Sequence, residues 1–178
     1  MTKALPSAEQ LERQALEAFR ARRQDEAAAA FEAARKAYTE AGERGKAAEM
    51  ANNLSVALLF GGHARRALQA VEGMPQVFHE LGDATHEAQA WGNLASALEA
   101  CGELRAAEDS YRHALELFVS LGDDENRALC LRSLSQLQLR RGRVMEASLT
   151  AHSALQAQGG RPRGLTRLLG WLLRLRAR

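Results

Sequence analysis

The sequence predicts an all-α fold in which a helical hairpin recurs four times, and two observations carry this prediction. Glycines and alanines recur at a spacing of forty residues: Gly42, Gly82 and Gly122, then Gly62, Gly102 and Gly142, and Ala27, Ala67, Ala107 and Ala147. Such a period is typical of stacked repeats. Strong helix formers (Ala, Leu, Glu, Gln and Arg) dominate the composition, Ile is absent and Pro occurs three times, which favours helices over strands.

Each repeat is predicted to contain two antiparallel helices. Within residues 104–118 the apolar residues recur every three or four positions, as on one face of a helix: Leu104, Ala107, Tyr111, Ala114, Leu115 and Phe118. Gly122 can take a left-handed conformation that ends this helix, and the aspartates after it can cap the next one, at about 124–141. The units are expected at about 7–42, 45–82, 84–122 and 124–158.

The second unit departs from this pattern at Gly73-Met74-Pro75, inside its second helix. Proline removes an amide donor and clashes with the preceding turn, so the helix should kink or restart near Pro75. The break is interpreted either as a tolerated surface kink or as a feature that shapes a site on the back of the array.

No constellation of residues with catalytic chemistry was found. The glycines are turn elements rather than a phosphate-binding loop, and the five histidines have no metal-ligand spacing. No enzymatic activity, cofactor or metal is therefore expected. Cys101 and Cys130 are isolated, and residues 1–14 lack the apolar run of a signal peptide, so the cytoplasm is the expected location. The high Ala and Arg content suggests a GC-rich bacterial genome.

The order of residues within a unit identifies a family resemblance. In the third unit a bulky residue, Leu, a small residue, Leu, the turn Gly, Ala, an aromatic residue and Ala follow one another: Trp91, Leu94, Ala95, Leu98, Gly102, Ala107, Tyr111 and Ala114. This order resembles the tetratricopeptide repeat, and the resemblance extends over about residues 7–158, with Arg22 in place of the turn glycine in the first unit. The forty-residue length is similar to the long variant of kinesin light chains and Pins-type scaffolds.

The resemblance implies a right-handed superhelix of four hairpins, whose first helices line a concave groove for a segment of a partner protein. The groove residues implied by position are Arg13, Glu49, Asn52, Asn53, Val56, Phe60, Gln89, Asn93, Ser96, Arg132 and Gln136. Asn53 and Asn93 occupy one repeat position, and a carboxamide can donate to and accept from a peptide backbone at once. Alternatively, these asparagines bond neighbouring helices. A clamp for chaperone carboxylates is not expected, because the accompanying Lys and Arg are absent.

The C-terminal residues 161–178 differ in charge from the rest of the chain. They contain six arginines and no acid, whereas residues 1–160 carry 18 basic and 22 acidic residues. Leu165, Leu168, Leu169, Leu172 and Leu175 form one apolar face of a predicted helix, which either caps the last repeat or contacts a membrane or another copy. The residues expected in the latter two roles are Leu168, Trp171, Leu172, Leu173 and Arg174. Nucleic-acid binding is not expected, because the body is acidic and stacking aromatics are lacking.

The expected function is that of an adaptor that binds a peptide or a partner-protein segment. The alternative is a peripheral membrane or self-assembling scaffold that works through its basic tail.

Overall fold

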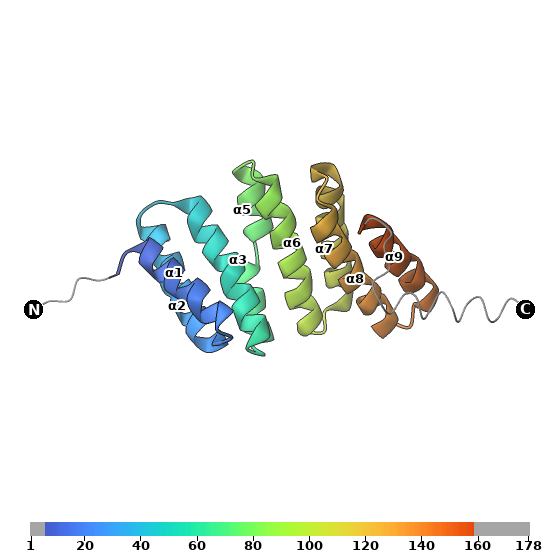
Figure 1. The fold of residues 1–178 in the computed structure, drawn as a ribbon, viewed down its shortest axis with the longest axis horizontal. Helices are drawn as coiled ribbons and strands as arrows, with labels where there is room; N and C mark the ends of the chain where they lie inside the picture. The colour runs from blue at the N-terminus through green and yellow to red at the C-terminus, as the bar shows by residue number, and fades with distance from the viewer. Residues whose placement is uncertain (1–5, 159–178) are drawn as a thin grey trace, which may run out of the picture. The chain divides into compact units, whose positions relative to one another are not determined.

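The structure, a computed structural model, describes residues 6–158, and within that range the chain folds into nine helices and no strand. The first helices of the four hairpins are α1 (Ala8–Arg20), α3 (Arg44–Phe60), α6 (Ala84–Ala100) and α8 (Asp124–Arg140). The second helices are α2 (Gln24–Glu40), α4 (Ala64–Val71) with α5 (Met74–Glu80), α7 (Leu104–Leu121) and α9 (Val144–Ala157). The predicted all-α solenoid of helical hairpins is confirmed (Figure 1).

The helices form two compact units, which we describe separately. Unit 1, Met1–Leu121, contains α1 to α7, and unit 2, Gly122–Arg178, contains α8 and α9. In unit 1 the second helix of one hairpin also packs on the first helix of the next, since α2 contacts both α1 and α3, and α6 contacts α4, α5 and α7. In unit 2, α8 packs on α9. Each hairpin of unit 1 therefore covers apolar surface that its neighbour would otherwise expose to water.

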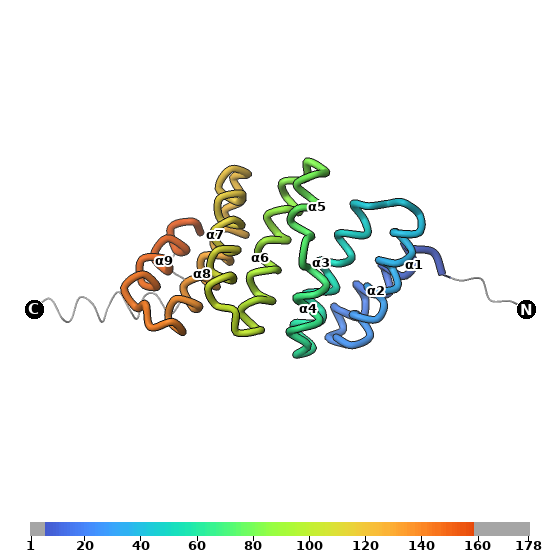
Figure 2. The backbone as a smooth tube through the Cα atoms, turned by 180° about the vertical axis from the view of Figure 1, so that it is seen from behind, coloured from blue at the N-terminus to red at the C-terminus, as the bar shows by residue number. Residues whose placement is uncertain are grey.

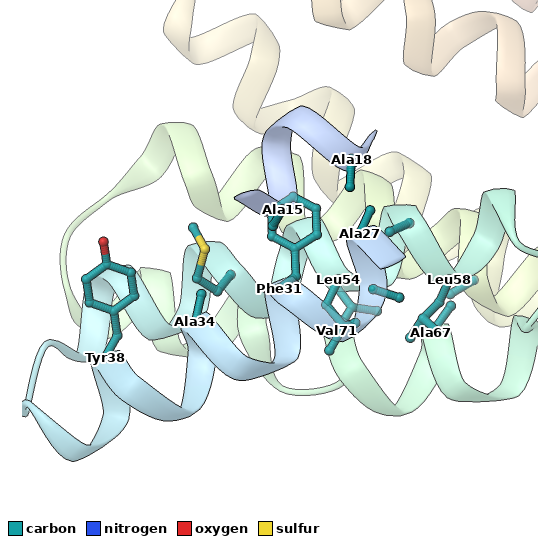
Figure 3. Packing of buried hydrophobic residues seen from close by; sticks show 14 residues of the cluster. Ala15, Ala18, Ala27, Phe31, Ala34, Tyr38, Leu54, Leu58, Ala67 and Val71 are labelled. Carbon is teal, nitrogen blue, oxygen red and sulfur yellow. The ribbon is translucent and has the colours of Figure 1, made fainter. Parts of the chain in front are cut away.

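The core of unit 1 combines small and aromatic side chains. The alanines at the recurring position, Ala27, Ala67 and Ala107, are 0% exposed, so helix backbones approach closely there. Phe31 is 1% exposed, Tyr38 is 2% exposed, and both belong to the same cluster as Ala15, Ala34, Leu54 and Val71 (Figure 3). The recurring alanines thus set the spacing of the helices, while a few large side chains fill the remaining volume.

The turns confirm the role assigned to the recurring glycines. Gly42, Gly62, Gly82, Gly102, Gly122 and Gly142 all have φ between 68° and 85° at the ends of their helices. Arg22 takes the same place in the first hairpin with φ 59°, and no other non-glycine residue among residues 6–158 has a positive φ. Since a Cβ is disfavoured in this region, Arg22 is a strained residue in an otherwise consistent set of turns.

Substitution of Arg22 by glycine is expected to raise the free energy of unfolding by about 1 kcal/mol, because it removes the left-handed strain. The reverse change, Gly102→Ala, is expected to lower it by about 1 kcal/mol. A Cβ at Gly102 meets no atom within 4 Å, so the backbone conformation alone sets this cost. Urea unfolding of the two variants measures both effects, and a stabilising Gly102→Ala change would contradict the explanation.

The predicted break near Pro75 is confirmed. Helix α4 ends at Val71, Gly73 has φ 78°, and α5 begins at Met74 with Pro75 in its first turn. Proline is tolerated at this place because the amide it lacks has no partner within the helix. Figure 2 shows α4 and α5 as two separate segments, end to end on the side seen from behind.

Aspartates begin two of the first helices. The side chain of Asp83 accepts from the backbone amide of His86 at 3.0 Å, and that of Asp123 accepts from Asn126 at 3.0 Å, as predicted for Asp123. The hydrogen bond from the His86 amide holds the pKa of Asp83 below its usual value. The pKa of Asp123 is lowered chiefly by its hydrogen bond from the Asn126 side chain. Both caps therefore act in their ionised form.

Removal of both caps in D83A/D123A is expected to cost about 2 kcal/mol near neutral pH, about 1 kcal/mol for each helix. Because folding lowers both pKa values, this stabilisation is present above about pH 4 and is lost as the pH falls through the folded-state pKa values. Urea unfolding at about pH 7 and about pH 3 should therefore show the difference between wild type and variant shrinking in acid. A difference that is independent of pH would contradict the assignment.

Candidate functional site

The candidate site is the surface of α1, α3 and α6, which we call the first-helix face of unit 1 (Figure 1). The predicted residues on α3 lie at intervals of three, one, three and four positions, and therefore on one side of the helix. They are Glu49, Asn52, Asn53, Val56 and Phe60. Arg13 on α1 is exposed, and Gln89, Asn93 and Ser96 on α6 are half-buried.

A polar network joins four helices toward the beginnings of α3 and α6. The Tyr38 hydroxyl donates to Glu12 Oε2 at 2.6 Å, and Lys46 Nζ donates to Glu49 Oε2 at 2.9 Å. Lys46 Nζ also lies 4.0 Å from Glu12 Oε1, and His86 Nε2 lies 4.0 Å from Glu49 Oε1. The hydrogen bond to Glu49 raises the pKa of Lys46, and burial raises the pKa of Tyr38. Lys46 is therefore already paired with carboxylates of the same chain.

The middle of the face contains three asparagines whose side chains make no hydrogen bond to any described residue. Asn53 and Asn93 are half-buried. Asn52 is 4% exposed, and its Oδ1 is buried without a partner. Within residues 6–158 no contact supports the alternative in which these asparagines bond neighbouring helices. Ser96, in contrast, donates to the carbonyl of Gly92 at 3.0 Å.

The end of the face is aromatic. Phe19 in the last turn of α1 and Phe60 at the end of α3 meet edge to face, with ring centroids 5.9 Å apart and planes at 68°. Phe60 is 70% exposed. An aromatic ring that remains so exposed, next to a second ring, is a ready anchor for an apolar group.

In unit 2 the predicted residues Arg132 and Gln136 are exposed on α8. Leu129 and Leu139 are 50% and 51% exposed, and together the four residues recur at three- and four-residue steps along one side of the helix. The sequence interpretation missed these two leucines, although the spacing alone would have identified them. The exposed side of α8 is therefore more apolar than was predicted.

A cleft lies next to the break between α4 and α5. It is on the side of unit 1 that carries α2, α4 and α5, which we call the back of unit 1 (Figure 2). A cleft of about 510 Å³ lies between α2 and the α4–α5 pair and has α3 as its floor. Ala51, Leu54 and Leu58 line the floor, while Arg35 and Arg66 belong to opposite walls. None of the residues predicted for the groove lines this cleft.

Two further observations concern metal sites and membrane-spanning helices. No group of three or more His, Cys, Asp or Glu residues in the described part of the chain is placed to hold a metal ion. No helix in that same part is long and apolar enough to cross a membrane. The predicted membrane or self-association residues Leu168, Trp171, Leu172, Leu173 and Arg174 lie outside the described residues.

Comparison with known proteins agrees with the repeat pattern and the fold. Residues 86–158 match the family model described as tetratricopeptide repeat, and no curated protein matches the chain in sequence. BtubC (BKLC) from P. vanneervenii is similar in structure, with a TM-score of 0.77 at 20% identity over 88% of this chain and 67% of that one. The putative kinesin light chain repeats of Podospora anserina have a TM-score of 0.74 at 16% identity, over 90% of this chain and 80% of that one.

A third similar structure is a Rap protein complexed with Competence and Sporulation Factor. It has a TM-score of 0.77 at 16% identity, and the match covers 86% of this chain but 43% of the Rap chain. The chain therefore spans less than half the length of that protein. The match over residues 86–158 and the shared fold therefore make this chain similar to tetratricopeptide repeat proteins.

Proposed function

We propose that this protein is an adaptor that binds an extended segment of a partner protein across the first-helix face of unit 1. Tetratricopeptide repeats are in general interaction modules for protein or peptide partners rather than catalysts. The proposal adds a location to that general role. It rests on Asn52 and Asn53, which share helix α3 with the exposed ring of Phe60, and on Asn93, which occupies the position of α6 equivalent to Asn53.

The unpaired asparagine side chains are the observation that carries the proposal. A buried polar atom without a partner costs about 1–3 kcal/mol, so Asn52 Oδ1 is a stability cost in the free protein. A peptide backbone offers a donor and an acceptor at every residue, and the carboxamides of Asn53 and Asn93 can engage both. A bound segment would supply hydrogen bonds to Asn53 and Asn93, which are half-buried, whereas Asn52 Oδ1 is buried and not accessible to a ligand in the free protein.

The two ends of the first-helix face indicate which kinds of residue the bound segment contains. Phe19 and Phe60 offer apolar contact at one end. At the other end the cation of Lys46 is held by Glu49, so no cation in this network is left to clamp a terminal carboxylate. We therefore infer a segment of mixed polar and apolar residues that contributes its backbone and an apolar anchor.

We also place this adaptor in the cytoplasm. Burial raises the pKa of the Cys130 thiol to about 12. An unreactive buried thiol behaves as a small apolar side chain and suits a reducing compartment.

Selection of binding peptides from a random displayed library on the full chain tests the proposal. The selected peptides should bind the wild type, and Phe60→Ala should weaken binding at least ten-fold in fluorescence anisotropy. Phe60 is 70% exposed, so its removal should leave thermal stability almost unchanged.

The double variant R65A/Q69A is the matched control, because it truncates exposed side chains of α4 and leaves α1, α3 and α6 intact. Its affinity for the peptides should equal that of the wild type. Selected peptides that lose affinity for R65A/Q69A but not for F60A would place the binding surface on the back and overturn the proposal.

A further inference from the structure

The cleft on the back of unit 1, which we call the back cleft, lies where the second hairpin departs from the repeat in two side chains. The forty-residue spacing makes Ala51 the equivalent of Trp91, and Gly73 the equivalent of His113. In the third hairpin the rings of Trp91 on α6 and His113 on α7 pack together, with centroids 4.7 Å apart. The second hairpin therefore has a methyl group and a hydrogen atom where the third hairpin has two packed rings.

The space that these missing rings leave is open. Ala51 lines the floor of the cleft of about 510 Å³, and a Cβ at Gly73 would meet no atom within 4 Å. Leu11 and Leu131 take the position of Ala51 in the first and fourth hairpins, so only the second hairpin has a small residue there. The volume lies within the roughly 300–1,000 Å³ that is typical of small-molecule sites.

The back cleft is apolar along its length. Its floor is the side of α3 from Ala47 to Leu58, about 16 Å of helix, and Met74 and Val77 add apolar wall. Because the amides inside a helix already bond to its own carbonyls, these helices offer few donors to a peptide backbone. The cleft therefore suits an elongated apolar chain better than a polypeptide segment.

The cleft also contains a cation that has no carboxylate partner. The guanidinium of Arg35 donates to both oxygens of Glu32, at 3.0 and 2.7 Å, and Arg44 is paired with Glu80. Arg66, in the first turn of α4, lines the cleft and makes no hydrogen bond or ion pair with any residue of the described part of the chain. An anion in the cleft would therefore find its cation at Arg66.

A second donor lies next to this cation. Gln69 also lines the cleft, and residues three positions apart on a helix lie on the same side, so its carboxamide and the guanidinium of Arg66 can donate to one carboxylate. The lining carboxylate Glu72 stands six residues after Arg66, at the end of α4. The charges along α4 therefore favour an anionic group beside Arg66 and Gln69.

We propose that the back cleft binds an elongated amphipathic carboxylate, of the kind that a free fatty acid provides. Its carboxylate is held by Arg66 and Gln69, and its chain lies along α3 over Ala51. None of the residues predicted for the groove lines this cleft, so the site is independent of the peptide site on the first-helix face.

Isothermal titration calorimetry of the full chain with dodecanoate, below its micelle concentration, tests the proposal. The wild type should bind dodecanoate with one-to-one stoichiometry. R66A should weaken this binding by roughly ten-fold to 100-fold, the effect expected when a hydrogen bond to a charged group is lost. Dodecyltrimethylammonium, which joins the same chain to a cation, should bind the wild type more weakly than dodecanoate does.

A cleft-filling variant tests the floor. A51W installs the residue that α6 has at this position and should abolish dodecanoate binding. A51L installs the smaller residue of the first and fourth hairpins, so it keeps the test valid if the larger ring unfolds α3, and it should weaken binding with an unchanged circular dichroism spectrum. R65A is the matched control, because Arg65 is exposed on α4 and does not line the cleft, and it should bind as the wild type does.

Four outcomes overturn the proposal. The first is a wild type that does not bind dodecanoate, and the second is equal affinity for dodecanoate and dodecyltrimethylammonium. The third is binding that A51L or R66A leaves unchanged. The fourth is a set of ¹⁵N chemical-shift changes centred on Met145 and Leu149, which are 79% and 67% exposed on α9, instead of on Ala51 and Leu54. That pattern would mean that dodecanoate only coats exposed apolar side chains.

Discussion

Replacement of Phe31 by alanine is expected to lower the free energy of unfolding by about 3–5 kcal/mol. Phe31 is 1% exposed and lies on α2, the helix that packs on both α1 and α3. The neighbouring side chains include several alanines, which are too short to refill the volume that the ring leaves. The loss should appear in urea unfolding as a lower midpoint with an unchanged slope.

Phe60→Ala is the matched control, since it deletes the same ring from α3 at a site that is 70% exposed. Its cost should be within about 1 kcal/mol, because most of that ring already contacts water. Equal losses for the two variants would mean that burial between hairpins is not what stabilises unit 1.

The double variant N53A/N93A is expected to weaken peptide binding by roughly 30-fold to 1000-fold. The two carboxamides together would contribute about 2–4 kcal/mol of hydrogen bonding to a bound backbone. Neither side chain makes a hydrogen bond to a described residue, so stability and helicity should be retained. Fluorescence anisotropy with a library-selected peptide measures the affinity, and circular dichroism measures the melting temperature.

Asn126→Ala is the control, and we expect it to lower stability without weakening peptide binding. The Asn126 side chain donates to Asp123 Oδ2 at 2.7 Å, so its loss should reduce stability and spare binding. A collapse of stability in N53A/N93A would instead show that these asparagines hold helices together.

The repeat period made most of the fold predictable, because turn glycines and recurring alanines obey local rules. A left-handed turn favours glycine, as at Gly42 and Gly102, and Pro75 must interrupt a helix or begin one. Arg22 shows the limit of such rules, since the turn forms there without its preferred residue.

The details of the candidate site depend on tertiary contacts that no local rule provides. The meeting of Phe19 with Phe60 joins residues forty-one positions apart, and the link from Tyr38 to Glu12 joins two helices. The sequence placed both Asn52 and Asn53 in the groove, and it could not indicate that Asn52 is 4% exposed while Asn53 is half-buried. The back cleft depends on the distance between α2 and the α4–α5 pair, which the break at Gly73 does not fix by itself.

The most direct measurement is a nuclear magnetic resonance titration of the ¹⁵N-labelled full chain with a library-selected peptide. Side-chain amides of asparagine are observed directly, so Asn52, Asn53 and Asn93 report on their own hydrogen bonds. We predict that these three amide signals shift together and saturate at the same peptide concentration. Shifts confined to Arg66, Gln69 and their neighbours on the back of unit 1, with the three asparagine signals unmoved, would contradict the account.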